Sequence, residues 1–154
     1  MATVLDMIDN IKAIDLKSIA RTVMQKNADV FTEFNRQQMM EGKRKDGKNI
    51  GDSPGRRGYY QSLMYARDKQ KKNSKAGFMN PDLYLTGAFQ DSMYMNVKGE
   101  DIVMDSTDSK AADLLKDYGG TIYGLNEEKK PEFVEVIMPE FHEVIEKQTG
   151  LKFN

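Results

Sequence analysis

Apolar residues recur every three or four positions through the first forty residues of the chain. Residues 4–13 have the spacing of a short helix. Asp15 then has a side chain suited to an N-cap, and we predict that a long helix runs from it to about Glu41 and ends at Gly42. We interpret Gln37, Gln38 and Asn27 as an ordinary polar face of this helix. The predicted core residues are Ile19, Val23, Val30, Phe31 and Phe34.

The helical pattern stops in the middle of the chain. Residues 42–58 combine glycine, proline and charged side chains at a density typical of a long loop. Loops of more than about 12–15 residues in compact domains are usually functional or disordered, and we expect neighbouring subunits to order this one. Residues 59–72 predict a short helix, which ends in the polar and glycine-containing stretch 73–77.

The second half of the chain predicts a mixture of strands and helices. In residues 82–93 several apolar residues are followed by a glycine and then by a pattern that predicts a further helical turn. Residues 94–98 and 102–106 alternate apolar and polar side chains about a Gly-Glu-Asp turn, which predicts a β-hairpin. Helical spacing returns at 108–118 and stops at two consecutive glycines.

The C-terminal part completes the predicted fold. Residues 133–138 are rich in β-branched side chains and predict a strand, and Pro139 suits the first turn of a final helix to about Gln148. We therefore predict an α+β fold with a long N-terminal helix, a small, mostly antiparallel sheet, a short helix, a C-terminal helix and a long basic loop. The 154 residues fit a single domain with a helical part (1–41), a basic loop and short helix (42–81) and an α+β part (82–154).

Charge is divided unevenly along a chain whose net charge is only −1. Residues 36–75 carry twelve basic and four acidic groups, net +8, whereas 76–154 carry seven basic and fifteen acidic groups, net −8. Three interpretations stay open: the basic stretch contacts the acidic half of a neighbouring copy, it is a solvated loop, or it binds nucleic acid through phosphates. The nucleic-acid interpretation adds Tyr59, Tyr60 and Tyr65 as stacking surfaces.

A contact between neighbouring copies would join the densest basic positions to glutamates of the C-terminal half. Exposed ion pairs are worth only ~0–1 kcal/mol each, so no single pair is expected to decide such a contact. The expected donors are Lys43, Arg44, Lys45, Arg56 and Arg57, and the expected acceptors are Glu127, Glu128, Glu140 and Glu143.

Candidate catalytic and metal-binding residues are few. The chain has no cysteine and one histidine, His142, which excludes thiol nucleophiles, iron–sulfur clusters and multi-histidine centres within one chain. Asp101, Asp105 and Asp108 offer hard oxygen ligands, but their spacing matches no ion-binding loop. We find no phosphate-binding glycine loop, nucleophile elbow or zinc-protease motif. We therefore expect no catalytic residue, no bound metal and no cofactor.

A short motif begins at Leu85. The chain resembles the virion morphogenesis and tail-completion family of tailed bacteriophages in the stretch Leu85-Thr86-Gly87-Ala88-Phe89-Gln90-Asp91-Ser92-Met93. The family signature has its leucine, threonine, glycine, large apolar residue and serine in the order of Leu85, Thr86, Gly87, Phe89 and Ser92. In that family a hairpin, a short alanine-containing helix ending in aromatic-glycine, and a proline-aromatic strand entering a last helix follow the signature. In this chain the hairpin corresponds to residues 94–106, the alanine-containing helix to 111–119, and the last part to 131–149. Residues 120–130 resemble a small insertion. The resemblance covers about half of the chain.

The resemblance implies a structural virion protein without chemistry of its own, a ring-forming neck or tail-completion subunit at the head–tail junction or the tail end. Its partners would be copies of itself in a ring and other neck or tail proteins, with DNA passing through the ring, and no membrane or small-molecule ligand. It would be made in the cytoplasm of the host bacterium and located in the virion. No apolar run approaches the ~18–20 residues that cross a bilayer, and the acidic N-terminus is unlike a signal peptide.

Two alternatives stay open. Thr86 and Gly87 also fit an ordinary tight turn in which Gly87 adopts a positive φ, with Phe89 and Met93 in the core. In function, the alternative to a virion subunit is a nucleic-acid-binding module that uses segment 42–77. The acidic C-terminal half weighs against this alternative, because it repels phosphates.

Overall fold

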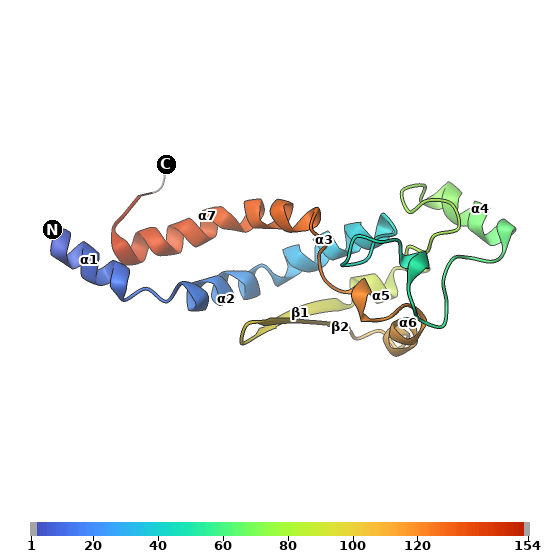
Figure 1. Cartoon of the computed structure of the whole chain (residues 1–154), viewed down its shortest axis with the longest axis horizontal. Helices are drawn as coiled ribbons and strands as arrows, with labels where there is room; N and C mark the ends of the chain where they lie inside the picture. Colours follow the sequence, from blue (N-terminus) through green and yellow to red (C-terminus); the bar gives the residue numbers. More distant parts are fainter. Residues whose placement is uncertain (1–2, 153–154) are drawn as a thin grey trace.

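The computed structural model describes residues 3–152, which form an elongated molecule (Figure 1). Its elements in chain order are α1 (Val4–Lys12), α2 (Leu16–Lys26), α3 (Ala28–Met40), η1 (Ile50–Asp52), α4 (Leu63–Lys72), α5 (Ala88–Asp91), β1 (Met93–Lys98), β2 (Asp101–Ser106), α6 (Ala111–Tyr118), η2 (Gly120–Ile122) and α7 (Lys129–Thr149). α1, α2 and α3 follow one another along the long axis, and α7 runs back beside them. The hairpin β1–β2 lies beside α2 and α3, whereas α4, α5 and α6 lie toward the end farthest from α1.

The arrangement is an α+β fold in which helices dominate, as predicted. The sheet of the described residues is the predicted antiparallel hairpin, with Met95 opposite Met104 and Val97 opposite Ile102. Gln25 of α2 covers the outer edge of β1. Its side chain donates to the Met95 carbonyl at 3.4 Å and accepts from the Val97 N–H at 2.8 Å. This contact joins the hairpin to α2 and covers backbone groups that would otherwise form an open sheet edge.

The long N-terminal helix predicted to start at Asp15 is divided in two at Asn27. Its predicted beginning is confirmed, because the Asp15 carboxylate accepts a hydrogen bond from the first turn at 3.1 Å. The Asn27 amide donates to the Val23 carbonyl and to the Glu140 carboxylate, each at 2.8 Å. A side chain that bonds to the preceding turn competes with regular helical geometry, so α3 begins as a separate helix.

The strand predicted over residues 133–138 is wrong, because α7 occupies those residues. Every fourth residue from Phe133 to Ile145 is buried or half-buried, and this face packs against α2 and α3. The continuous apolar face outweighs the β propensity of the valine and isoleucine side chains. Pro139, predicted in the first turn of a helix, lies inside α7, where its ring removes one backbone hydrogen bond.

Aromatic contact between α3 and α7 forms the middle of the core. The rings of Phe31 and Phe133 meet edge to face, with their centroids 5.2 Å apart. The predicted core is confirmed for three positions that are buried, and the remaining two are half-buried in the same clusters. The buried positions are Ile19, Val23 and Phe31, and the half-buried ones are Val30 and Phe34.

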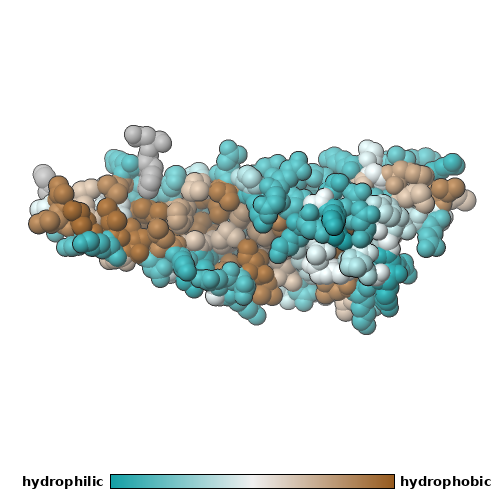
Figure 2. Space-filling model, in the orientation of Figure 1, coloured by the Kyte–Doolittle hydropathy of each residue, from teal (hydrophilic) through white to brown (hydrophobic). Residues whose placement is uncertain are grey.

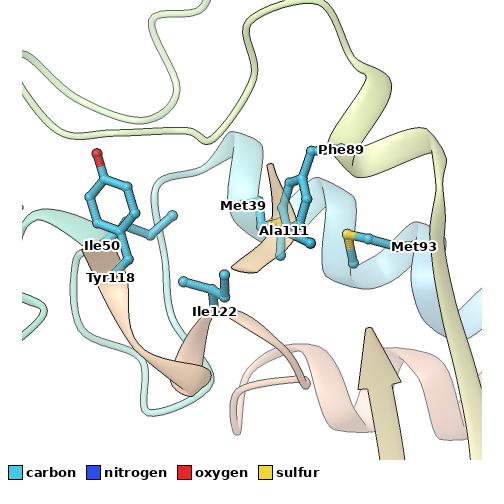
Figure 3. Close-up of a cluster of buried hydrophobic side chains, with 7 residues drawn as sticks. All are labelled: Met39, Ile50, Phe89, Met93, Ala111, Tyr118 and Ile122. Atoms are coloured by element: carbon cyan, nitrogen blue, oxygen red, sulfur yellow. The ribbon is translucent and has the colours of Figure 1, made fainter. Parts of the chain in front are cut away.

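A further apolar cluster joins segments that are far apart in the chain (Figure 3). Its side chains come from α3, η1, α5, β1, α6 and η2. Ile50 and Ile122 are fully buried in it, so the polar middle of the chain contributes directly to the core. The seven members are Met39, Ile50, Phe89, Met93, Ala111, Tyr118 and Ile122.

Asn35 and Gln38 of α3 are fully buried although both side chains are polar. The Asn35 amide donates to the Ile122 carbonyl at 3.1 Å and accepts from the Gly124 N–H at 2.9 Å. The Gln38 amide donates to the Gly124 carbonyl and accepts from the Asn126 N–H, both at 2.8 Å. The prediction of an ordinary polar face is therefore wrong at Gln38. Together the two amides, which we call the amide clamp, satisfy four backbone groups of the connection between η2 and α7.

Replacing Asn35 by alanine should lower the free energy of unfolding by about 2–4 kcal/mol, because two buried backbone groups lose their partner. Urea unfolding followed by circular dichroism measures the change. Gln37→Ala is the matched control, since Gln37 is exposed on the same helix, and it should stay within about 0.5 kcal/mol of the wild type. Equal stability of the two variants would show that the amide clamp contributes nothing.

Candidate functional site

Residues 42–81, called the basic segment below, are folded against the body of their own subunit. The backbone N–H groups of Arg56 and Arg57 donate to carbonyls at the end of α6, at 3.1 and 3.0 Å. Gly55 lies so close to α6 that a Cβ there would be 2.2 Å from the Asp117 carbonyl oxygen. Contacts within one subunit thus order this segment, where the sequence predicts ordering by neighbouring subunits.

Two buried polar side chains, Asn80 and Asp82, hold the basic segment together. The Asn80 amide accepts from a backbone N–H of η1 at 2.8 Å and donates to the carbonyls of Gly42 and Ala76 at 2.9 and 2.8 Å. The Asp82 carboxylate forms an ion pair with the Lys69 ammonium of α4 at 2.6 Å. One amide therefore joins the beginning, middle and end of the segment, and one carboxylate attaches α4.

Arg44, a predicted donor to a neighbouring copy, is instead only 5% exposed. It forms an ion pair with Asp46, and this hydrogen bond lowers the pKa of the Asp46 carboxyl and raises that of Arg44. Lys43, beside it, donates to the Asn49 side-chain oxygen at 2.7 Å. Lys45 is exposed. Of these three predicted donors, Lys45 is placed best to meet another molecule.

Arg56 and Arg57, the other predicted donors, lie over the C-terminal end of α6. Their guanidinium groups approach the Asp117 carboxylate at 2.9 and 3.6 Å, and Arg56 lies 4.0 Å from the Asp113 carboxylate. Both arginine side chains remain mostly exposed. They are therefore held by their own subunit and still accessible to a partner.

The four predicted acceptors lie at the start of α7 and along it, and three of them have a partner in their own subunit. Within residues 3–152, none of them forms an ion pair with a predicted donor. Their contact with a neighbouring copy stays a prediction. Glu127 pairs with Lys130 at 2.6 Å, Glu143 pairs with Lys147 at 3.0 Å, Glu140 accepts from Asn27 at 2.8 Å, and Glu128 is exposed.

The motif that begins at Leu85 forms a tight turn into α5. Gly87 adopts a left-handed conformation with φ of +89°, and a Cβ there would lie 3.0 Å from the Tyr84 hydroxyl oxygen. The Thr86 hydroxyl accepts from the Ala88 N–H at 3.3 Å and so supports the turn. Leu85 is 69% exposed at the head of this turn. The positive φ expected at Gly87 is confirmed.

The second half of the motif belongs to the core. Phe89 and Met93 are buried, as the tight-turn interpretation predicts. The Phe89 carbonyl accepts from the Ser106 hydroxyl at 3.0 Å, and the Ser92 carbonyl accepts from the Thr107 N–H at 3.2 Å. The Ser92 hydroxyl also donates to a carbonyl of α5. These bonds fix the turn against the open end of the hairpin, and the Leu85 side chain therefore remains exposed to solvent.

A groove of about 600 Å³ opens beside this turn, between the basic segment and α5 and α6. The rings of Tyr60 and Tyr65 meet edge to face within it, with centroids 4.9 Å apart. Burial, together with the nearby Asp82 charge, raises the pKa of Tyr60, so its phenol stays protonated at neutral pH. We call this the tyrosine groove, after the five tyrosines that line it, Tyr59, Tyr60, Tyr65, Tyr84 and Tyr118.

The candidate ligands for a metal ion do not converge. In the part of the chain that the structure describes, no three His, Cys, Asp or Glu side chains are arranged to hold a metal. Asp101 and Asp105 lie on β2, and Asp108 accepts from the Lys110 N–H at 2.8 Å in the turn before α6. His142 is half-buried on α7. None of the helices within residues 3–152 is both long and apolar enough to cross a membrane.

Comparisons of this chain with protein-family models, with curated proteins and with solved structures found no match. The resemblance that begins at Leu85 therefore depends on the residues and on the order of the elements that follow. Residues 131–133 depart from it, because they lie in the first turns of α7 instead of in a strand. Residues 120–130 include the connection held by the amide clamp, and four of them, Ile122, Leu125, Asn126 and Lys129, are buried.

The sequence patterns did not indicate the buried polar residues that hold the site together. Asn80 and Asp82 are polar side chains in a polar stretch, and nothing in their spacing indicates burial. The Asn-Pro dipeptide at 80–81 is a turn signal that points to this place. The sequence indicated only three of the five tyrosines of the groove, because Tyr84 and Tyr118 come from other parts of the chain.

Replacing Gly87 by alanine should lower the free energy of unfolding by about 1–2 kcal/mol, because a side chain in the left-handed region is strained. Thermal unfolding followed by circular dichroism measures it. Gly120→Ala is the matched control, since Gly120 has no positive φ and open space around it, and should stay within about 1 kcal/mol of the wild type. A Gly87→Ala variant as stable as this control would show that the turn tolerates a side chain.

Proposed function

We propose that this chain is a structural subunit of a tailed-bacteriophage virion, which assembles with copies of itself into a ring at the neck or tail end. The observation that carries the proposal is the succession of elements after Leu85. A left-handed turn at Gly87, a hairpin, a short helix that ends at Tyr118 before a glycine, and a last long helix follow one another. The family that the motif resembles has this order, apart from the strand that α7 replaces here.

The surface of the subunit supports a role in binding other protein chains. Large apolar side chains are exposed at both ends of an elongated molecule, on α1 and around α4 and the Leu85 turn. Exposed apolar patches of this kind mark protein interfaces, and tyrosine is enriched in them. The groove is lined by phenols and aliphatic side chains with charged groups among them, namely Arg56, Arg57, Asp108 and Lys110, and such a mixed lining suits contact with a protein surface.

The test of this proposal is the location of the chain in intact particles. Gold-labelled antibody against the purified chain should label the neck or tail end of phage particles in electron microscopy. A nonsense mutation in the gene should remove the label and give particles in which heads and tails are unjoined or tail ends are incomplete. Unlabelled wild-type particles, or a normal yield of infectious particles without the chain, would overturn the proposal.

The second candidate function is binding of nucleic acid by the basic segment. The observation that favours it is the pair Lys71 and Lys72 in the last turn of α4, of which Lys72 lies in a small hollow together with Tyr65 and Tyr84 of the tyrosine groove. The burial of Arg44 and the pairing of Arg56 and Arg57 with Asp117 weigh against it, because these cations are already partly neutralised.

A virion subunit of this kind should bind duplex DNA only weakly at physiological salt, with Kd of about 10⁻⁴ M or worse. The affinity should fall steeply as salt rises, because it depends on counterion release. Fluorescence anisotropy of a labelled duplex measures it, and Lys71→Glu with Lys72→Glu is the control for non-specific contacts of α4. A tight complex that resists salt would favour the nucleic-acid function instead.

A further inference from the structure

α1 presents an apolar face that its own subunit leaves uncovered. Val4 and Leu5 are each 72% exposed, and Ile8 and Ile11 are also exposed. The helix itself is well formed, because the Thr3 and Asp6 side chains close a capping box at its start. α1 contacts α7 but buries none of its residues, whereas each other α-helix of the described chain buries at least one. Figure 2 shows hydrophobic side chains gathered at this end of the molecule.

A different surface surrounds the tyrosine groove, whose lining residues belong to the part of the molecule that holds α4, α5 and α6, at the end opposite to α1 in Figure 1. Leu85 stands exposed at its edge, and Tyr59, Tyr65 and Tyr84 are exposed along it. The groove volume of about 600 Å³ is enough for several aliphatic side chains, and falls in the usual range for binding pockets. Because the two surfaces lie at opposite ends of a long subunit, α1 cannot fill the groove of its own copy.

The charges of the two ends are complementary. Residues 3–20 and 138–152, which make up the α1 end, carry six acidic and four basic groups, net −2. Residues 42–92 and 107–118, which make up the groove end with the acidic groups of α6 included, carry thirteen basic and eight acidic groups, net +5. Opposite charge on two surfaces favours their encounter and fixes their orientation. Two α1 ends, in contrast, would meet with like charge.

We propose that the apolar face of α1 in one copy docks in the tyrosine groove of the next copy, next to the Leu85 turn. The inference rests on the proposed function, in which the chain assembles with copies of itself, and adds the surfaces that meet. The contact joins two different patches and is therefore heterologous. Repeated from copy to copy, it forms a ring if the rotation between subunits closes, and a filament if it does not.

The absence of cysteine from the chain permits a direct test by cross-linking of introduced cysteines. Leu5→Cys and Leu85→Cys are made as separate variants and mixed with a short bismaleimide. The mixture should give a cross-linked dimer at least about tenfold more efficiently than a mixture of Leu5→Cys with Asn96→Cys, because docked residues meet at a high effective concentration. Asn96 is the control position, since it is exposed on β1, outside the groove.

A variant that carries both Leu5→Cys and Leu85→Cys should give a ladder of cross-linked oligomers, because each copy then has a reactive group at both ends. Each single variant alone should stay close to the control. Both replaced side chains are exposed, so circular dichroism should show native folding. Thr86→Cys serves as a second variant at the same edge of the groove.

Two results would overturn the inference. Efficient dimers from Leu5→Cys alone would show that α1 meets α1 in a symmetric contact. A mixture of the α1 and groove variants no more reactive than the Asn96 control would show that the groove does not receive α1. Neither result bears on the proposed function, because antibody labelling of particles tests the virion location separately.

Discussion

The amide clamp of Asn35 and Gln38 determines where the second half of the chain crosses the first. The connection between η2 and α7 has no strand beside it, so two side chains provide the four hydrogen bonds that a strand partner would otherwise supply. With the connection held there, Ile122 enters the cluster that also contains η1 and α6. α7 then starts where Phe133 can meet Phe31, and the elongated pairing of α2 and α3 with α7 follows from that start.

Buried polar groups also explain why a segment so rich in charge is folded at all. Asn80 satisfies backbone groups of the basic segment, and Asp82 neutralises Lys69 within the fold. Asp46 does the same for Arg44, which is nearly inaccessible. A buried cation without such a partner would cost several kcal/mol, so these carboxylates are a condition for the packing of this region. Part of the positive charge of this segment is therefore neutralised by ion pairs inside the folded subunit, and only the rest is presented at its surface.

Local signals predicted the elements whose conformation is decided within a few residues. Asp15 begins α2, the hairpin turns at Gly99, and α6 ends before Gly119, because caps and turn glycines act on their immediate neighbours. Residues 133–138 are helical for a reason that no local pattern conveys, namely the apolar faces of α2 and α3 against which they pack. Gln38 and the carbonyl it binds are 86 positions apart, and the tyrosine groove likewise combines three separate stretches of chain.

α1 has nine residues, fewer than the ~12–15 below which an isolated helix is marginal in water. Its capping box and its contact with α7 stabilise it, but without a buried side chain little of its apolar area leaves water. Any surface that covers Val4, Leu5, Ile8 and Ile11 would add the missing burial and would also hold the helix in its formed state. Helix formation and contact with a further surface therefore reinforce each other. The same reasoning does not apply to α4, which is also short and exposed, because Ala66 is buried and Lys69 is tied to Asp82 within the subunit.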